Sequence, residues 1–152
     1  VHPVQTAQEM LTAVEGLLPA DAAVFTAAVA DWRMADAHGQ KIKKESSGAP
    51  PVLQFAENPD ILARVSAHEL RPQLVLGFAA ETEHVIDNAT SKRLRKGCDW
   101  IVANDVTPQT GIMGGAHNKI TFIDKVGAET WDEMPKIDVA RRLAQRIADA
   151  LT

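Results

Sequence analysis

Apolar residues follow two different spacings along this chain, one typical of helices and one typical of buried strands. After Thr6 and Glu9, which have the spacing of a capping box, apolar residues recur every three or four positions up to Pro19. We therefore expect an amphipathic helix there. Residues 22–30 then form one apolar run that is partly β-branched or aromatic, as in a strand buried on both faces of a parallel sheet.

The same two patterns continue toward the C-terminus. Asn58 and Pro59 indicate a helix start, with Asn58 as the N-cap and Pro59 at the first helical position, and this helix should end near His68. Further along we expect a strand at 73–80, a helix at 82–96 that Thr82 caps and Gly97 closes, a strand at 100–104, a hairpin of 119–124 with 127–131, and a final amphipathic helix at 137–151.

Alternation of strands and helices predicts an α/β domain. We expect a Rossmann-like, three-layer domain in which helices cover a mostly parallel sheet and a small hairpin lies near the C-terminus. At 152 residues the chain fits one domain, residues 1–152. Residues 34–52 lack any core period and are predicted to form a long loop with at most a short extended piece. In such folds ligands bind at the carboxyl ends of the strands.

The charge is acidic overall but unevenly spread. A formal net charge of -4 argues against a general nucleic-acid-binding protein, which normally carries a basic surface. Positive charge is nevertheless concentrated in two short windows, and this favours a local anion site. The basic residues of these windows are Lys41, Lys43 and Lys44 in the first, and Lys92, Arg93, Arg95 and Lys96 in the second.

The apolar runs are too short to span a bilayer, and no charged-then-apolar leader precedes them. We therefore expect a soluble, cytoplasmic protein without a membrane partner. The single cysteine, Cys98, cannot form an internal disulfide and fits a reducing compartment. No base lies beside it in the sequence, so we expect a structural role for Cys98 and no nucleophilic one.

Candidate functional residues follow three of the predicted strands. Asp31 follows the first, Phe78 lies near the end of the second, and Asn104 and Asp105 end the third. The sequence has no dinucleotide-binding glycine fingerprint, no P-loop and no serine elbow. Its five histidines have no zinc-like spacing, so the metal ligands stay unassigned.

Each candidate also has a structural alternative. Asp31 could serve only in a surface turn, and Phe78 could be core packing where a nucleobase contact is the other reading. Lys92 and Lys96 lie four positions apart on one helix face, where they could hold one phosphate chain or simply complement the helix dipole. The lysines of 41–44 could be a solvated loop.

Six segments stand in a fixed order along the chain: Ala27-Ala28-Val29-Ala30-Asp31-Trp32-Arg33, Lys41-Ile42-Lys43-Lys44, Asn58-Pro59-Asp60-Ile61-Leu62, Val75-Leu76-Gly77-Phe78-Ala79-Ala80-Glu81-Thr82, residues 92–96, and Ala103-Asn104-Asp105-Val106. Together they resemble bacterial phosphopantothenoylcysteine synthetase, which is commonly the C-terminal ligase domain of a bifunctional decarboxylase/synthetase of coenzyme A biosynthesis. Each motif is weak alone, but the ordered set is specific.

The resemblance implies a ligase that joins 4'-phosphopantothenate to L-cysteine with CTP and Mg2+. In the family an acyl-cytidylate forms with release of pyrophosphate, and the cysteine amine then displaces CMP. FMN would belong only to an upstream decarboxylase domain. Family members usually form dimers, so a homodimer or a higher oligomer is expected.

The resemblance also implies roles for individual residues. Lys41 matches a flexible-loop lysine implicated in catalysis, and Ala27 and Ala28 match small residues that line the reaction site. The positions that bind CTP in the family are matched by Asp31, Lys41, Pro59, Asp60, Ile61, Leu62, Phe78, Lys92 and Lys96.

One departure from the family concerns the Gly-rich stretch at the start of the synthetase and the Asn that processes the acyl-cytidylate. Neither has a match here. We therefore expect residues 1–152 to be the C-terminal portion of the synthetase domain, incomplete for catalysis. The alternative from another class is a non-catalytic nucleotide-binding α/β module, and a Rossmann-like oxidoreductase is disfavoured by the absent fingerprint.

Overall fold

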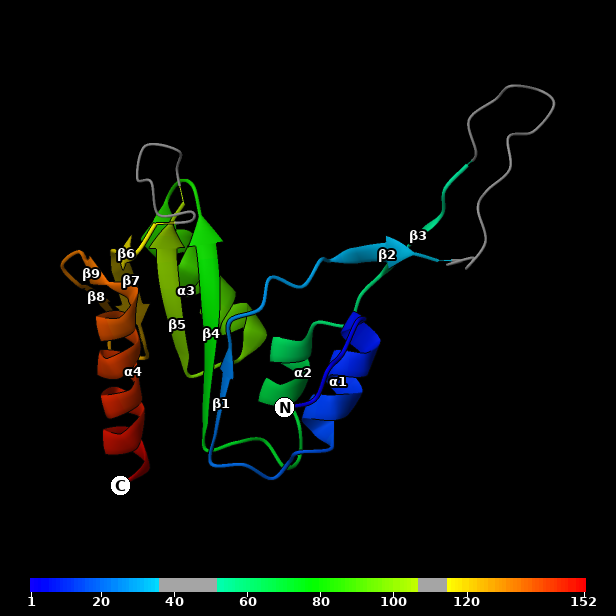
Figure 1. Cartoon of the computed structure of the whole chain (residues 1–152), viewed down its shortest axis with the longest axis horizontal. Helices are drawn as coiled ribbons and strands as arrows, with labels where there is room; N and C mark the ends of the chain where they lie inside the picture. Colours follow the sequence, from blue (N-terminus) through cyan, green and yellow to red (C-terminus); the bar gives the residue numbers. More distant parts are fainter. Residues whose placement is uncertain (36–51, 107–114) are drawn as a thin grey trace.

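The computed structural model of this chain describes residues 1–35, 52–106 and 115–152 (Figure 1). The helices in these residues are α1 (Ala7–Glu15), α2 (Ile61–Ser66), α3 (Val85–Lys96) and α4 (Lys136–Leu151). The strands are β1 (Ala22–Phe25), β2 (Trp32–Met34), β3 (Phe55–Glu57), β4 (Leu74–Glu81), β5 (Trp100–Asp105), β6 (His117–Asn118), β7 (Ile120–Ile123), β8 (Ala128–Thr130) and β9 (Met134–Pro135).

A five-stranded sheet in the order β1-β4-β5-β7-β8 forms the centre of the fold (Figure 1). The pairs β1–β4 and β4–β5 are parallel, whereas β5–β7 and β7–β8 are antiparallel. Helix α3 packs on one face and α4 on the other, so the predicted three-layer α/β architecture is confirmed. The predicted hairpin is β7 with β8, and it makes the sheet mixed.

Each face of the sheet has its own apolar cluster. The cluster on the α3 face consists of Val75, Ala79, Ala89, Cys98, Ile101, Ala103 and Ile123. The cluster on the α4 face consists of Leu76, Val102, Ile120, Phe122, Trp131, Val139 and Leu143. Strand β4 supplies alternate residues to both clusters, which is why its sequence is a continuous apolar run.

The first strand is shorter and more exposed than its sequence predicts. It ends at Phe25, where its pairing with Gly77 of β4 ends, and residues 26–31 continue without strand structure. Within the described residues β1 pairs only with β4, and the Val24 side chain is 48% exposed. The expectation of burial on both faces is therefore wrong for β1.

Two helix starts also differ from the prediction. Asp60, two residues after Asn58, caps α2 by accepting a hydrogen bond from the Ala63 N–H at 3.1 Å. Helix α3 begins at Val85, because β4 runs on to Glu81 and the chain turns through a left-handed His84 with φ 47°.

Strands β2 and β3 pair with each other as an antiparallel ribbon that projects from the sheet (Figure 1). No strand is predicted from the sequence at 32–34 or 55–57, because each is three residues long and its partner lies on the other side of residues 36–51. The loop predicted at 34–52 lies almost wholly outside the described residues. Trp32 and Phe55 are each 62% exposed. An exposed aromatic pair of this kind is unusual on a surface that has no partner.

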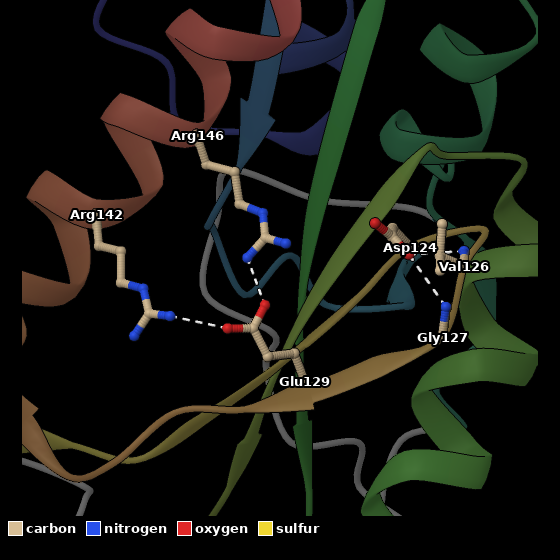
Figure 2. A network of polar contacts seen from close by, with 6 residues as sticks. All are labelled: Asp124, Val126, Gly127, Glu129, Arg142 and Arg146. Carbon is tan, nitrogen blue, oxygen red and sulfur yellow. Dashed lines mark hydrogen bonds and ion pairs between the residues drawn. The ribbon is translucent and has the colours of Figure 1, made fainter.

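Helix α4 is held against the sheet by charged as well as apolar contacts. Figure 2 shows the Glu129 carboxylate of β8 between two guanidinium groups, Arg142 at 2.8 Å and Arg146 at 2.6 Å. Arg142 also lies 4.0 Å above the Trp131 ring, and Arg146 lies 4.1 Å above Phe122. The hydrogen bond from Arg146 is the main cause that lowers the pKa of Glu129.

Shortening a buried leucine of α4 should destabilise the fold far more than the same change at an exposed one. Leu143 is 7% exposed, whereas Leu94 on α3 is 67% exposed. Leu143→Ala should lower the free energy of unfolding by about 2–5 kcal/mol, because it leaves a cavity under the helix. Leu94→Ala should change it by less than about 0.5 kcal/mol. Urea denaturation measures both, and equal losses would contradict the assigned core.

Candidate functional site

An open cleft of about 750 Å³ lies at the carboxyl ends of β1 and β4. Most of its lining comes from four parts of the chain: residues 25–31 at the end of β1 and after it, residues 57–62 around the start of α2, residues 78–80 of β4, and the last turns of α3. Met10 of α1 and Asn104 of β5 complete it. This edge is where parallel α/β sheets bind their ligands. The volume is in the range usual for small-molecule sites.

Every predicted site residue that the structure describes lines this one cleft. These residues are Ala27, Ala28, Asp31, Pro59, Asp60, Ile61, Leu62, Phe78, Lys92 and Lys96. They come from segments separated by up to about half of the chain, and the fold brings them together. Lys41, predicted as the catalytic residue, lies outside the described residues, as do Lys43 and Lys44.

The two lysines of α3 reach carboxylates outside their own helix. The Lys92 ammonium is 2.9 Å from the Glu81 carboxylate at the end of β4, and Lys96 pairs with Asp60. Their side chains are only 31% and 20% exposed. Whatever these lysines contribute to the helix dipole, each is held beside the cleft by an acid. An anion that enters the cleft has to compete with these carboxylates.

Asp60 therefore has two partners. One carboxylate oxygen caps α2 through the Ala63 N–H, and the other pairs with Lys96 of α3. The beginning of α2 and the end of α3 are thus tied to the same side chain. This arrangement keeps residues 59–62 and the two lysines together in the lining of one cleft.

The segment after β1 is positioned by Asn58. The Asn58 side-chain amide donates to the Ala30 carbonyl at 2.8 Å, and its backbone N–H donates to the Asp31 carbonyl at 2.8 Å. Among the described residues, the Asp31 carboxylate itself makes no hydrogen bond or ion pair. A turn residue would use its side chain to hold the turn. At this position Asn58 does so, and the Asp31 carboxylate is left exposed at the cleft.

A glycine in β4 allows the wall formed by α2 to approach closely. A Cβ atom on Gly77 would lie 2.6 Å from the Leu62 Cδ2 atom. Leu62 therefore rests directly on the backbone of β4, beside the apolar cluster on the α3 face. Phe78, the next residue, packs partly against the opposite cluster, as its structural alternative expects, and it also lines the cleft. Its contact with a nucleobase stays a prediction.

Several residues in or beside the cleft are not among the positions matched to the family's CTP-binding and substrate-lining residues. Arg95 and Asn104 line the cleft, Glu81 pairs with Lys92, and Asn58 positions the Asp31 segment. Arg95 and Asn104 stand in segments that the sequence singles out, the basic window and the end of a strand. No feature of the sequence indicates a role for Glu81, because its ion pair with Lys92 depends on where α3 places that lysine.

Outside the cleft, the described residues offer few reactive or metal-binding side chains. Cys98 is 3% exposed, and burial is the main cause that raises the pKa of its thiol to about 11. The thiol is protonated at neutral pH, in keeping with a structural role. Outside residues 36–51 and 107–114, no three His, Cys, Asp or Glu side chains are grouped as they would be around a metal ion. Among the described helices, none has the length and apolar character that crossing a membrane requires.

Comparison with known proteins identifies the class of domain. Residues 1–151 match the family described as DNA/pantothenate metabolism flavoprotein C-terminal domain, and the chain belongs to this family. It is 42% identical over 150 residues to the coenzyme A biosynthesis bifunctional protein CoaBC of Escherichia coli strain K12. That match covers 97% of this chain and 36% of the relative, so the chain spans about a third of the relative's length.

Two further matches bear on the fold and on the breadth of the family. A crystal structure of the C-terminal domain of a coenzyme A biosynthesis bifunctional protein CoaBC superposes with a TM-score of 0.72 at 32% identity, covering 95% of this chain and 62% of that one. A cysteine/cysteine sulfinic acid decarboxylase from an unknown prokaryotic organism is 38% identical over 126 residues, which are 82% of this chain and 34% of that protein. The family resemblance expected from the sequence is confirmed.

Proposed function

We propose that this chain forms the nucleotide-binding part of a phosphopantothenate–cysteine ligase that uses CTP in coenzyme A biosynthesis. The observation that carries the proposal is the convergence of the family's CTP-binding positions on one cleft at the carboxyl edge of the sheet. Residues that served only as turns, caps and core would not be expected to share one cavity. The relatives named coenzyme A biosynthesis bifunctional protein CoaBC support the assignment to coenzyme A biosynthesis.

The chemistry of the cleft suits this reaction. Lys92 and Lys96 offer positive charge to a triphosphate, and Asp31 offers an acceptor to ribose hydroxyls or a base amino group. Phe78 provides an aromatic surface for the base, and Ala27 and Ala28 leave room for the acyl substrate. Residues 59–62 and Lys41 complete the proposed set, with Lys41 as the catalytic lysine.

The proposed reaction has two steps. The carboxylate of 4'-phosphopantothenate attacks the α-phosphorus of CTP, a P–O bond breaks, and pyrophosphate leaves. The cysteine amine then attacks the acyl carbon of the acyl-cytidylate and loses a proton, and CMP leaves as the amide forms. Both steps develop negative charge on phosphate oxygens, which fixed cations stabilise. Mg2+ would accompany the triphosphate, with ligands that the described residues do not assign.

We further propose that residues outside 1–152 complete the site with the family's glycine loop and Asn. Support comes from β1, which has a partner on one side only in the described sheet and carries the exposed Val24. An unpaired strand edge of this kind normally receives another strand or a cover. Catalysis by residues 1–152 alone should therefore be weak or absent.

A non-catalytic nucleotide-binding module is the alternative, and the nucleotide preference separates the two. The ligase reading requires CTP to bind in preference to ATP and NAD. Lys92→Ala should weaken CTP binding about ten- to a hundredfold, because a charged contact to a phosphate is lost. Calorimetric titration of the full-length protein with each nucleotide measures this preference. Equal affinity for all three nucleotides would contradict the ligase reading.

Lys125→Ala is the matched control for Lys92→Ala. Lys125 is an exposed lysine in the turn between β7 and β8, remote from the cleft-lining residues. Its replacement should leave the affinity for CTP unchanged, since it removes the same charge from the protein without touching the site. A loss as large as that of Lys92→Ala would show that overall charge, rather than the cleft, governs binding.

We also propose that the ribbon of β2 and β3 is a contact between two copies of the chain. The ribbon projects from the sheet (Figure 1), and its Trp32 and Phe55 side chains are each 62% exposed. Phe55→Asp should convert a dimer to a monomer, because a carboxylate cannot be buried there without a partner. Leu94→Asp, at an equally exposed leucine on α3, should not. Light scattering gives the mass of each variant, and an unchanged Phe55→Asp dimer would contradict the proposal.

A further inference from the structure

Two asparagine side chains meet behind the cleft. Asn104, in the last part of β5, lines the cleft beside Ala80, its register partner on β4. Asn118 of β6 is 9% exposed and donates its side-chain N–H to the Asn104 Oδ1 atom at 2.9 Å. The pair therefore links a cleft residue to a buried residue from the C-terminal half of the chain.

This hydrogen bond fixes which end of the Asn104 amide is used. With Oδ1 engaged by Asn118, the Asn104 amide has only its NH2 group left to offer. The Asn104 NH2 group has no hydrogen-bond partner among the described residues, and it is not among their buried unpaired atoms. It is thus a neutral donor that solvent or a ligand can reach. The cleft that Asn104 lines holds Lys92, Arg95 and Lys96 as well as the carboxylates of Asp31, Glu57 and Asp60. A neutral donor beside these cations suits an anionic oxygen of a ligand.

Asn118 is an energetically unfavourable residue for a buried position. Its own Oδ1 atom is buried without a hydrogen-bond partner in the part of the chain that the structure describes. A buried polar atom without a partner destabilises a fold, and an apolar residue of similar size would avoid that cost. Ile120, two residues further along the chain, packs in the apolar cluster on the α4 face. The hydrogen bond that Asn118 donates instead orients the Asn104 amide.

We infer that Asn104 is a substrate-binding residue whose amide donates a hydrogen bond to an anionic oxygen of the bound substrate, and that Asn118 is the positioning residue that sets this orientation. The inference rests on the proposed function for the identity of the substrates. The oxygen is either a phosphoryl oxygen of the nucleotide or an oxygen of the carboxylate or phosphate of the acyl substrate. All are acceptors of the same kind, and a rigidly aimed donor stabilises charge that develops on such an oxygen.

Variants of Asn118 in the full-length protein test the orientation. Asn118→Asp can only accept, so it should turn the Asn104 amide around and present its oxygen to the anion, lowering kcat about a hundredfold. Asn118→Leu removes the restraint without reversing it and should lower kcat about tenfold. Asn104→Ala should lose about as much as Asn118→Asp. In the Asn104→Ala background, either change at Asn118 should then have no further effect on kcat.

Thr121→Val is the matched control. Thr121 of β7 is 8% exposed and shares a hydrogen bond of 3.1 Å with Thr130, so its replacement removes a buried polar contact close to β6 without touching the cleft. It should lower the unfolding temperature while leaving kcat unchanged. If Asn118→Asp and Asn118→Leu also changed only the unfolding temperature, or if their effects on kcat added fully to that of Asn104→Ala, Asn118 would not act through Asn104 and the inference would be wrong.

A direct readout does not depend on turnover or on the stability of the Asn118 variants. The side-chain 15N–1H signals of Asn104, assigned with Asn104→Ala in the asparagine-labelled protein, should shift when a ligand accepts its hydrogen bond. A shift with pyrophosphate and CTP places the acceptor on the nucleotide phosphates, and a shift with 4'-phosphopantothenate places it on the acyl substrate. Either result supports the inference. No shift with any of these ligands, or a shift with uncharged cytidine alone, would overturn it.

The proposed ligase function and the proposed role of Asn104 can be disproved independently. If the wild-type protein bound neither CTP nor 4'-phosphopantothenate, the proposed function would be wrong, and the response of Asn104 to pyrophosphate would still decide whether it is an anion donor. If the wild-type protein formed the amide product while Asn104→Ala kept its full kcat, the function would stand and this inference would be overturned.

Discussion

The Asp60 carboxylate is the side chain on which the geometry of the cleft depends. One of its oxygens caps the start of α2 by accepting from the Ala63 N–H, and the other pairs with Lys96 at the end of α3. Because a helix cap needs an acceptor and a lysine needs a negative partner, a single acid ties the start of α2 to the end of α3. The proposed nucleotide site is therefore arranged before any nucleotide arrives, and the ligand replaces contacts that already exist.

Small residues as well as charged ones determine the shape of the cleft. Gly77 allows Leu62 to touch the backbone of β4, and the run of alanines after β1 keeps the space beside it open. Asn58 holds that run in place through two backbone carbonyls. The apolar clusters on the two faces of the sheet keep the strand ends together, so the site is a consequence of the way β1, β4 and β5 pair.

Much of this could be predicted from the sequence, because the strong signals are local. The apolar run of β4 and the amphipathic pattern of α4 indicate their elements directly, and the order of motifs indicates the family. What could not be predicted depends on contacts between distant segments. Asn58 has the features of an N-cap, yet it bonds to Ala30, and the β2–β3 ribbon forms across residues 36–51. The ion pair of Glu81 with Lys92 likewise exists only once β4 and α3 lie side by side.

Pyrophosphate release from CTP by the full-length protein is the most direct test of the proposed ligase site. Release should require 4'-phosphopantothenate, ATP should support it poorly, and CMP should appear when L-cysteine is added. Release that is independent of 4'-phosphopantothenate, or that proceeds equally well with ATP, would contradict the assignment of this cleft to a CTP-dependent ligase.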